Sequence, residues 1–303
     1  MESISKYVKL DKKEENELRN NFYNHLKNGK FKDLCDQIDA TDDIKMKYTS
    51  LIEDASIEFS NCSNCKGLAN CKNKISGFMY TPIVNNKTIS FDYMACKYKN
   101  KEINDNKYLE NIELFQISES LKRANIKDVY TNDKARIDII KYFKDFIDNY
   151  GKNKVLGLYL NGSFGTGKTY LVAALFNEMA KRGVRSAIVY YPEFLRSLKE
   201  SFDTDYKDKF NYIRRVSLLL IDDIGAESVT AWSRDEILGS ILQYRMEEHL
   251  PTFFTSNLTI EELEEHLSNS NRGIERVKSR RIIERIKYIT KDLKLVSTNL
   301  RGK

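Results

Sequence analysis

The fold of this chain is decided by the stretch Gly162-Ser163-Phe164-Gly165-Thr166-Gly167-Lys168-Thr169. It fits the pattern G-x-x-x-x-G-K-[ST] at every fixed position. The apolar run at 155–160 that precedes it predicts a buried strand, and residues 170–182 have the apolar spacing of a helix that ends before Gly183. Strand, glycine-rich loop and helix follow one another in the order that a phosphate-binding loop (P-loop) requires.

The residue types of this stretch suit ATP and Mg²⁺. Glycines let successive backbone N–H groups turn toward phosphate oxygens, and the following helix points its positive end at the same place. Lys168 is predicted to reach the β- and γ-phosphates, and the Thr169 hydroxyl is predicted to be a ligand of Mg²⁺. The alternative is a glycine-rich turn that matches the pattern by chance, but the flanking strand and helix argue against it.

Beyond the loop, apolar strands alternate with helices. The predicted strands lie at 155–160, 186–191, 216–223, 251–257 and 293–297. Continuous apolar strands separated by helices indicate an α/β fold with a five-stranded parallel sheet covered on both faces. Ligands bind at the carboxyl ends of such strands, and Gly162, Asp222 and Asn257 all lie at these ends. Three strands are therefore expected to bring polar groups to one crevice.

Two carboxylates, Asp222 and Asp223, end an apolar strand, which is the Walker B arrangement. Asp222 is predicted to hold the water shell of Mg²⁺, and Asp223 to orient and polarise the attacking water. The usual second residue is Glu, so the shorter Asp223 predicts slow hydrolysis or assistance from Glu227. The alternative is a pair of Asp residues that caps the next helix. Asn257 is placed to hydrogen-bond the γ-phosphate or the water, the position called sensor 1, although an isolated Asn after a strand is more often a turn residue.

The carboxyl-terminal part of the chain is basic. Residues 271–303 contain eleven Lys and Arg against three Asp and Glu, whereas the whole chain has a net charge of +6. Arg281 and Arg285 lie four residues apart on one helix face, and such an Arg can stabilise a transferring phosphate from a neighbouring subunit. The alternatives are a basic surface that binds DNA and a solvated helix face. We expect any bound DNA to be single-stranded, with Tyr190 and Tyr191 stacking on bases.

Cysteines between 61 and 100 indicate a structural zinc site. The four candidate ligands are Cys62, Cys65, Cys71 and Cys96. Four thiolates can close a tetrahedral Zn²⁺ site, and a site without an open position is structural rather than catalytic. The metal would replace the core that so short a segment lacks. The alternative is a set of reduced, buried cysteines. Cys35 lies apart and is predicted to be a core residue, and His25 is a reserve ligand.

Length and composition bound the class of protein. A chain of 303 residues, 41% hydrophobic and 31% charged, is long enough for about two domains. No apolar run of about 18 residues and no signal-peptide pattern is visible, which predicts a cytoplasmic protein without membrane contact. We expect a helical and zinc-binding domain at 1–100, a linker at 101–133 and an ATPase domain at 134–303. Few residues follow the last predicted strand, so no helical lid is expected.

Taken together, these motifs resemble those of a known family. The P-loop, the block 218–227, the triplet Thr255-Ser256-Asn257 and the arginine helix at 281–285, without a lid, look like the AAA+ ATPases of the bacterial DnaC and DnaI helicase loaders. The cysteine-bearing amino-terminal module is similar to the DnaI branch. The resemblance covers the chain from about residue 61 to the end, and residues 1–60 by layout alone.

The resemblance implies an AAA+ ATPase that loads a helicase. Such a protein grips the hexameric replicative helicase through its amino-terminal module and delivers it to single-stranded DNA during primosome assembly in DNA replication. It implies contact with other primosome proteins and ATP-dependent self-association. By position, Arg285 matches the family's arginine finger, with Arg281 as the second candidate. Some relatives have a His where this chain has none between Cys71 and Cys96, so the fourth zinc ligand is either Cys71 or another group.

Three other functions share parts of this pattern. A transposition helper ATPase has the same lidless core but normally lacks the cysteine module, so zinc content separates it from a helicase loader. A nucleotide-gated adaptor would bind ATP with little hydrolysis, which a Lys168→Ala comparison of binding and turnover would reveal. A DNA-binding module with an idle P-loop would bind DNA equally with and without ATP.

Overall fold

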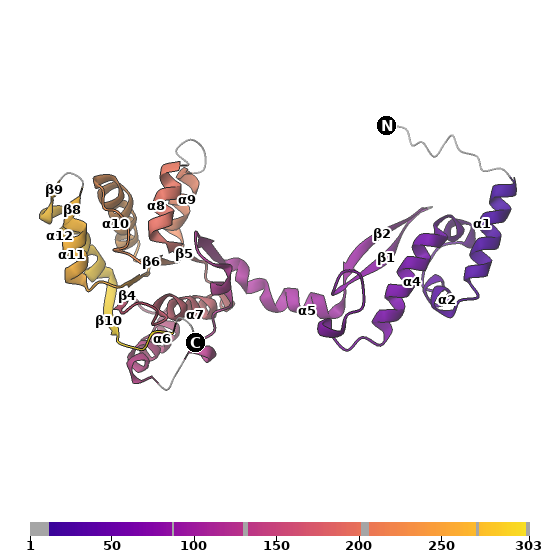
Figure 1. Cartoon of the computed structure of the whole chain (residues 1–303), viewed down its shortest axis with the longest axis horizontal. Helices are drawn as coiled ribbons and strands as arrows, with labels where there is room; N and C mark the ends of the chain where they lie inside the picture. The colour runs from indigo at the N-terminus through magenta and orange to yellow at the C-terminus, as the bar shows by residue number, and fades with distance from the viewer. Residues whose placement is uncertain (1–11, 87, 130–132, 201–205, 271–272, 301–303) are drawn as a thin grey trace. The chain divides into compact units, whose positions relative to one another are not determined.

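A computed structural model gives the fold of residues 12–86, 88–129, 133–200, 206–270 and 273–300. The chain divides into two compact units, Met1–Lys107 and Tyr108–Lys303, each with its own apolar core (Figure 1). Among the described residues, no helix has both the length and the apolar character needed to cross a membrane.

The first unit packs short helices around an aromatic and aliphatic core. The helices are α1 (Lys12–His25), α2 (Gly29–Cys35), α3 (Asp42–Lys45) and α4 (Thr49–Ser63), with the 3₁₀ turn η2 (Met46–Tyr48) before α4. Phe22 of α1 is fully buried against Phe31 of α2, with ring centroids 5.9 Å apart. Asn28 begins α2, because its side chain accepts a hydrogen bond from the backbone N–H of Lys30. The helices expected at the start of the chain therefore share one core.

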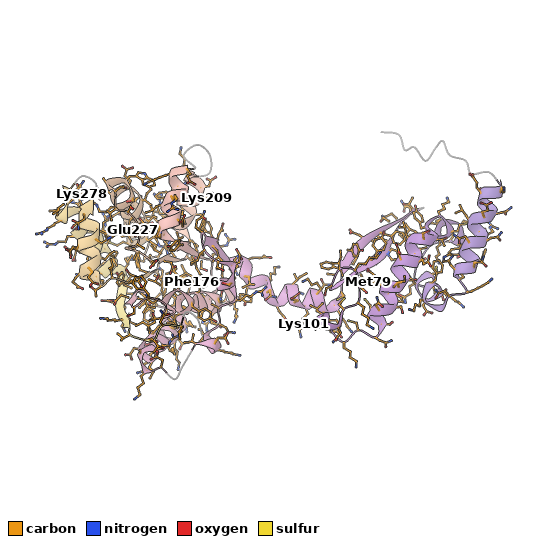
Figure 2. The ribbon with its side chains drawn as sticks, in the orientation of Figure 1. Met79, Lys101, Phe176, Lys209, Glu227 and Lys278 are labelled. Carbon is orange, nitrogen blue, oxygen red and sulfur yellow. The ribbon has the colours of Figure 1, made fainter. Side chains whose placement is uncertain are left out.

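A β-hairpin completes the first unit. Strands β1 (Phe78–Asn85) and β2 (Thr88–Ala95) pair antiparallel, and α5 (Lys97–Asn106) follows them. Ile89 packs on the helical core, while Met79, labelled in Figure 2, pairs across the hairpin with the half-exposed Met94. The sequence predicted a helical domain here and did not predict this hairpin. Most side chains of β1 are only partly buried, so the period-two alternation that marks a strand is weak there.

The second unit is built on a six-stranded, fully parallel sheet with the order β10-β4-β7-β6-β5-β3. The strands are β3 (Ile112–Phe115), β4 (Gly157–Gly162), β5 (Ser186–Tyr190), β6 (Leu218–Asp222), β7 (Thr252–Ser256) and β10 (Thr290–Leu295). Strand β6 shows why such strands are apolar throughout. Leu218 and Leu220 enter one apolar cluster, and Leu219 and Ile221 enter the cluster on the opposite face.

Helices cover both faces of this sheet. Helices α6 (Ile137–Asn149) and α7 (Lys168–Lys181) lie on one face, where the ring of Phe176 (Figure 2) meets that of Phe253 edge-on at 5.1 Å. The other face carries α8 (Tyr191–Glu200), α9 (Tyr206–Arg215), the π-helical turn η8 (Trp232–Leu238), α10 (Gly239–Glu247), α11 (Ile260–Ser268) and α12 (Arg276–Ile289). A short hairpin of β8 (Asn269–Ser270) and β9 (Gly273–Ile274) precedes α12.

The predicted α/β fold with a parallel sheet is confirmed, but the sheet has six strands instead of five. The additional strand, β3, falls in the predicted linker 101–133 and pairs with β5 at the sheet edge. Residues that follow β3 also belong to this unit, because the Asn177 side chain of α7 donates a hydrogen bond to the Leu121 carbonyl at 3.1 Å. The structure thus differs from the predicted linker from Tyr108 onward. After β10, the described residues 296–300 contain no helix.

Candidate nucleotide-binding site

The P-loop joins the end of β4 to the start of α7. Gly165 and Gly167 have φ angles of 71° and 87°, in the left-handed region that glycine adopts without strain. A Cβ at position 165 would also lie 2.1 Å from Asn299 Oδ1, so the side chain of Asn299 would have to move to admit it. The loop therefore curls around the amino terminus of α7, where backbone N–H groups and the helix dipole favour an anion.

Lys168 points into this loop. Its ammonium group donates hydrogen bonds to the carbonyls of Gly162 and Ser163, at 2.9 and 3.0 Å, and to Asn257 Oδ1 at 2.8 Å. All three acceptors are uncharged oxygens. Phosphate oxygens bind an ammonium group more strongly, so a triphosphate in the loop would compete for the same donor.

Asp222, at the end of β6, accepts hydrogen bonds from two hydroxyl groups. Thr169 and Thr255 both donate to its Oδ1 at 2.6 Å. Burial raises the pKa of the Asp222 carboxyl, and the two hydroxyl donors oppose that rise. Thr169 and Asp222 therefore present adjacent oxygens, which are the ligands that Mg²⁺ prefers.

Asp223 has a φ of 57°, which is uncommon for a residue with a side chain. Its backbone N–H donates to Thr255 Oγ1 at 3.0 Å, and its Oδ1 accepts a hydrogen bond from Asn257 Nδ2 at 3.0 Å. Asn257 thus links Lys168 to Asp223. Thr255 has no motif of its own, and its only indication in the sequence is a hydroxyl residue within the apolar strand that ends at Asn257.

A pocket of about 900 Å³ contains these groups and others that no motif marks. The additional lining residues come from the predicted linker, from the 3₁₀ turn η7 (Lys134–Arg136) and from the carboxyl-terminal tail: Gln116, Ile117, Ser118, Ser120, Leu121, Asp128, Arg136 and Leu300. Arg136 is 2% exposed and donates to the carbonyl of Thr166 at 2.9 Å. The pocket is therefore closed by segments that lie far from the P-loop in sequence.

Glu227, considered as an assistant to Asp223, does not line this pocket. Its Oε2 accepts a hydrogen bond from the backbone N–H of Gly225 at 2.7 Å, and its Oε1 lies 3.8 Å from His266 Nε2. The side chain is buried (Figure 2 labels its position), and burial raises its pKa. Glu227 thus fixes the turn after Asp223.

The two tyrosines expected to stack on bases have different surroundings. Tyr190 lines the pocket, and burial raises the pKa of its hydroxyl, as do the nearby Asp223 and Asp222. Tyr191 is 1% exposed and donates its hydroxyl proton to the Ser233 carbonyl at 3.2 Å. The prediction that Tyr191 stacks on a base is therefore wrong, because its ring is part of the core.

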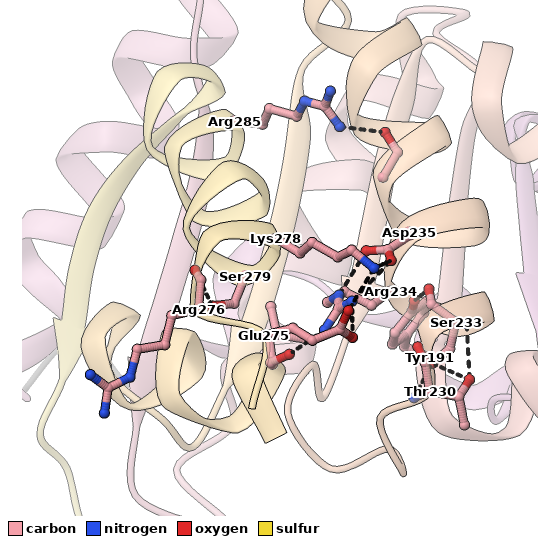
Figure 3. A network of polar contacts seen from close by, with 12 residues as sticks. Tyr191, Thr230, Ser233, Arg234, Asp235, Glu275, Arg276, Lys278, Ser279 and Arg285 are labelled. Atoms are coloured by element: carbon pink, nitrogen blue, oxygen red, sulfur yellow. Dashed lines mark hydrogen bonds and ion pairs between the residues drawn. The ribbon is translucent and has the colours of Figure 1, made fainter. Parts of the chain in front are cut away.

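Helix α12 carries the two candidate finger arginines. Arg281 is exposed, whereas Arg285 is half-buried and donates to the Gly239 carbonyl at 3.0 Å (Figure 3). Burial lowers the pKa of Arg285, and the charge of Arg281 lowers it further. Neither arginine lines the pocket of its own chain.

A buried ion-pair network ties η8 to the start of α12. Arg234 is 1% exposed and donates to Asp235 at 2.7 and 2.9 Å and to Glu275 at 2.8 Å. Lys278 approaches the same two carboxylates, at 3.4 and 2.6 Å, while Arg276 points away from the network (Figure 3). The position of the arginine helix is therefore coupled to the segment that leads from the Walker B strand into α10.

The four candidate zinc ligands of the first unit lie around the turn before the hairpin. Asn73 Nδ2 donates to Cys62 Sγ, and the Gly77 N–H donates to Cys71 Sγ, both at 3.3 Å. The Gly77 carbonyl accepts the backbone N–H of Cys96 at 2.8 Å. Burial raises the pKa of Cys62, and the other three thiols add to the rise. Within the described residues, no group of three or more His, Cys, Asp or Glu side chains is arranged to hold a metal ion.

The remaining candidates lie in the helical core of the first unit. Cys35 is 2% exposed, as expected for a core residue. The ring nitrogens of His25 lie 2.9 Å from the Asn21 carbonyl and 3.2 Å from Glu53. His25 thus has partners within the helices.

Known proteins match this chain over the pocket and beyond it. Residues 109–276 match the sequence model of the family described as IstB-like ATP binding protein. The chain is 40% identical over 246 residues to the replicative helicase loader DnaI of Bacillus subtilis (strain 168), covering 80% of this chain and 78% of the relative. A crystal structure of DnaI matches with a TM-score of 0.58 and 44% identity, over 64% of this chain and 100% of the other. The replicative helicase loader DnaC of Escherichia coli (strain K12) is 25% identical over 133 residues, 43% of this chain and 54% of the relative.

Proposed function

This chain belongs to the family of DnaI-type replicative helicase loaders with an IstB-like ATP-binding unit, and we propose that it uses ATP to load the replicative DNA helicase onto single-stranded DNA in bacterial replication. It is an ATPase. One observation carries the mechanism: the P-loop, the Walker B carboxylates and Asn257 leave the ends of three neighbouring strands and line one pocket.

In the proposed mechanism, each polar side chain acts on one part of the nucleotide. Lys168 exchanges its carbonyl partners for β- and γ-phosphate oxygens, and the P-loop N–H groups hold the same phosphates. Thr169 and Asp222 would hold Mg²⁺, which when bound would neutralise charge on the phosphates. Asp223 and Asn257 orient the attacking water, as a base and as a sensor of the γ-phosphate. Glu is the usual second carboxylate, so hydrolysis by Asp223 is slow.

The proposed hydrolysis depends on assembly, because an arginine has to come from a neighbouring copy. Arg281 is exposed, whereas Arg285 is occupied by Gly239 of its own chain. We therefore favour Arg281 as the side chain that reaches the neighbour's γ-phosphate, with Arg285 positioning the helix. This ranking differs from the one that sequence position alone suggested. It implies ATP-dependent self-association.

For the first unit, we propose a structural Zn²⁺ held by Cys62, Cys65, Cys71 and Cys96. Hydrogen bonds from Asn73 and Gly77 to two of the sulfurs support it, since N–H donors at a sulfur favour the thiolate that a metal requires. The Tyr98 hydroxyl donates to the Cys65 carbonyl at 3.1 Å and so ties α5 to the same loop. Zinc would supply stability to a segment whose hairpin has little core of its own.

We propose that the first unit binds the hexameric helicase. The similarity to DnaI spans 246 residues, whereas the second unit contains the 196 residues from 108 to 303, so the match has to extend into the first unit. That extent favours a loader over a transposition helper with only the ATPase core. Single-stranded DNA and other primosome proteins are the further proposed partners, and the basic helix α12 supplies charge for the DNA. The work takes place in the cytoplasm.

The test is helicase loading by the full chain. The host's replicative helicase is mixed with labelled single-stranded DNA, ATP and this protein, and helicase bound to DNA is measured. We expect loading by the wild type and none by Lys168→Ala, which removes the phosphate ligand. Lys141→Ala, an exposed lysine of α6, is the matched control. ATP binding without any gain in helicase on DNA would favour a nucleotide-gated adaptor with another cargo.

A further inference from the structure

We propose that residues 297–300, the carboxyl-terminal strap, complete the nucleotide site, with Leu300 packing on the nucleoside part of bound ATP. This inference rests on the proposed ATP site. It assigns a binding role to a segment without a motif, at the end of the described chain.

The pairing of β10 brings the strap to the P-loop. In the parallel register of β10 and β4, Leu295 lies opposite Gly162, the first residue of the P-loop. The chain that leaves β10 therefore emerges at the level of the loop. Two residues later, the Ser297 hydroxyl donates to the carboxylate of Asp133.

The strap is fixed to the loop itself. The backbone N–H of Leu300 donates to the Gly165 carbonyl at 2.8 Å. The side chain of Asn299 packs against Gly165, with its Oδ1 2.1 Å from the place where a Cβ of residue 165 would stand. Leu300 Cδ1 lies 3.8 Å from the place where a Cβ of Gly167 would stand. Two of the three loop glycines are thus covered by the tail.

A second set of contacts, through Asp133 and Arg136, also joins the strap to the P-loop. Asp133, which receives Ser297, lies 3.6 Å from the guanidinium of Arg136, and Arg136 donates to the Thr166 carbonyl. The loop is therefore held by the strap at Gly165 and by Arg136 at Thr166. A buried guanidinium and a backbone N–H thus donate to two successive carbonyls of the loop.

The chemistry of the pocket assigns Leu300 to the nucleoside. Phosphates and Mg²⁺ belong at Lys168, Thr169 and Asp222, whereas the apolar lining is supplied by side chains that include Ile117, Leu121 and Leu300. A purine and its ribose need apolar walls with a few polar groups between them. Leu300 is only partly buried, so a nucleoside placed against it would remove further apolar surface from water.

The test separates the nucleoside from the phosphates. ATP and inorganic tripolyphosphate are each titrated against a bound fluorescent ATP analogue, with Mg²⁺, for the full chain and for Leu300→Ala. We expect Leu300→Ala to weaken ATP about tenfold and to leave tripolyphosphate unchanged, because only the nucleoside loses a contact. Leu300→Met should retain most of the affinity. Equal ATP affinity of wild type and Leu300→Ala would overturn the proposal.

Two truncations supply an independent measurement. A chain that ends at Val296 lacks the strap, whereas a chain that ends at Leu300 keeps it and loses only Arg301, Gly302 and Lys303. We expect the first to bind ATP at least about tenfold more weakly and the second to match the wild type. Tighter binding by the shorter chain would show an obstructing tail and contradict the proposal. A wild type that binds no ATP would instead overturn the proposed nucleotide site, whatever the variants do.

Discussion

Thr255 donates its hydroxyl proton to Asp222 Oδ1 at 2.6 Å, from the strand adjacent to the one that carries the carboxylate. Thr255 Oγ1 in turn accepts the backbone N–H of Asp223 at 3.0 Å, and the backbone of Asp223 lies in the left-handed region. One threonine therefore holds the carboxylate of Asp222 and the backbone of Asp223. Thr169 contacts the same carboxylate oxygen, but it has to turn to Mg²⁺ in the proposed mechanism, so Thr255 is the partner that stays.

Removal of the Thr255 hydroxyl should lower the apparent affinity for Mg²⁺. Thr255→Val keeps the shape of the side chain, and we expect about a tenfold higher Mg²⁺ concentration for half-maximal ATPase activity, with nucleotide binding in the absence of Mg²⁺ unchanged. Thr255→Ser restores the hydroxyl and should restore the Mg²⁺ dependence. A merely structural role would lower activity in Thr255→Val at every Mg²⁺ concentration alike.

Asn257 should matter for turnover more than for binding. It joins Lys168 to Asp223, so Asn257→Ala is expected to lower kcat by about a hundredfold while the affinity for ATP changes by only a few-fold. Single-turnover hydrolysis and equilibrium binding, measured on the same preparation, separate the two effects. An unchanged kcat would exclude Asn257 from the chemistry.

The two arginines of α12 should separate in a mixing experiment. We expect Arg281→Ala to lose about a thousandfold in hydrolysis while still binding ATP, since a finger acts on the neighbour's nucleotide. Added Lys168→Ala protein, inactive alone, should restore activity to Arg281→Ala, because each variant supplies what the other lacks. Arg280→Ala, whose side chain pairs with Glu264, is the control. Restoration for Arg285→Ala but not for Arg281→Ala would reverse the assignment.

The Arg234 network should make stability depend on pH. Its hydrogen bond from Arg234 lowers the pKa of Asp235 below the usual 3.8, so the stabilisation from Asp235 is present above that value and is lost as the pH falls through the lowered pKa. Asp235→Asn should cost about 2 kcal/mol near neutral pH and progressively less below about pH 4, measured by urea unfolding. Asp138→Asn, an exposed carboxylate of α6, should cost less than about 0.5 kcal/mol throughout. A cost for Asp235→Asn that does not shrink in acid would rule out the ion pair as its cause.

Zinc should be measurable without any activity. We expect about one Zn²⁺ per chain by atomic absorption, and a lower melting temperature of the first unit after removal with a chelator. Cys71→Ser and Cys96→Ser should both lose metal, whereas Cys35→Ser should retain it, because Cys35 lies in the helical core. Retention of metal by Cys71→Ser would point to another fourth ligand.

The sequence predicted the chemistry of the second unit better than its boundaries. Lys168, Thr169, Asp222 and Asn257 could be placed together because strand ends and a contiguous motif are local patterns. Strand β3 was missed because a four-residue edge strand in a polar segment has little periodicity. Contacts such as Leu300 to Gly165 join residues 135 positions apart, and no local pattern encodes them.

The first unit shows the opposite limit. Its cysteines predicted a metal, but the hairpin depends on pairing between strands that are each half-buried. An indication was present in the alternation of Ile89, Phe91 and Tyr93, and in Asn86, which adopts a φ of 51° between the strands. The pattern was missed because residues 61–100 were interpreted from their composition.

Asn257 links two charged residues of the site, because its Oδ1 accepts a hydrogen bond from Lys168 and its Nδ2 donates one to Asp223. A free phosphate or a diphosphate would contact only part of this hydrogen-bonded series, so it would break hydrogen bonds and replace few of them. A metal-bound triphosphate would replace more of them. We therefore expect the site to prefer ATP with Mg²⁺ to ADP or phosphate.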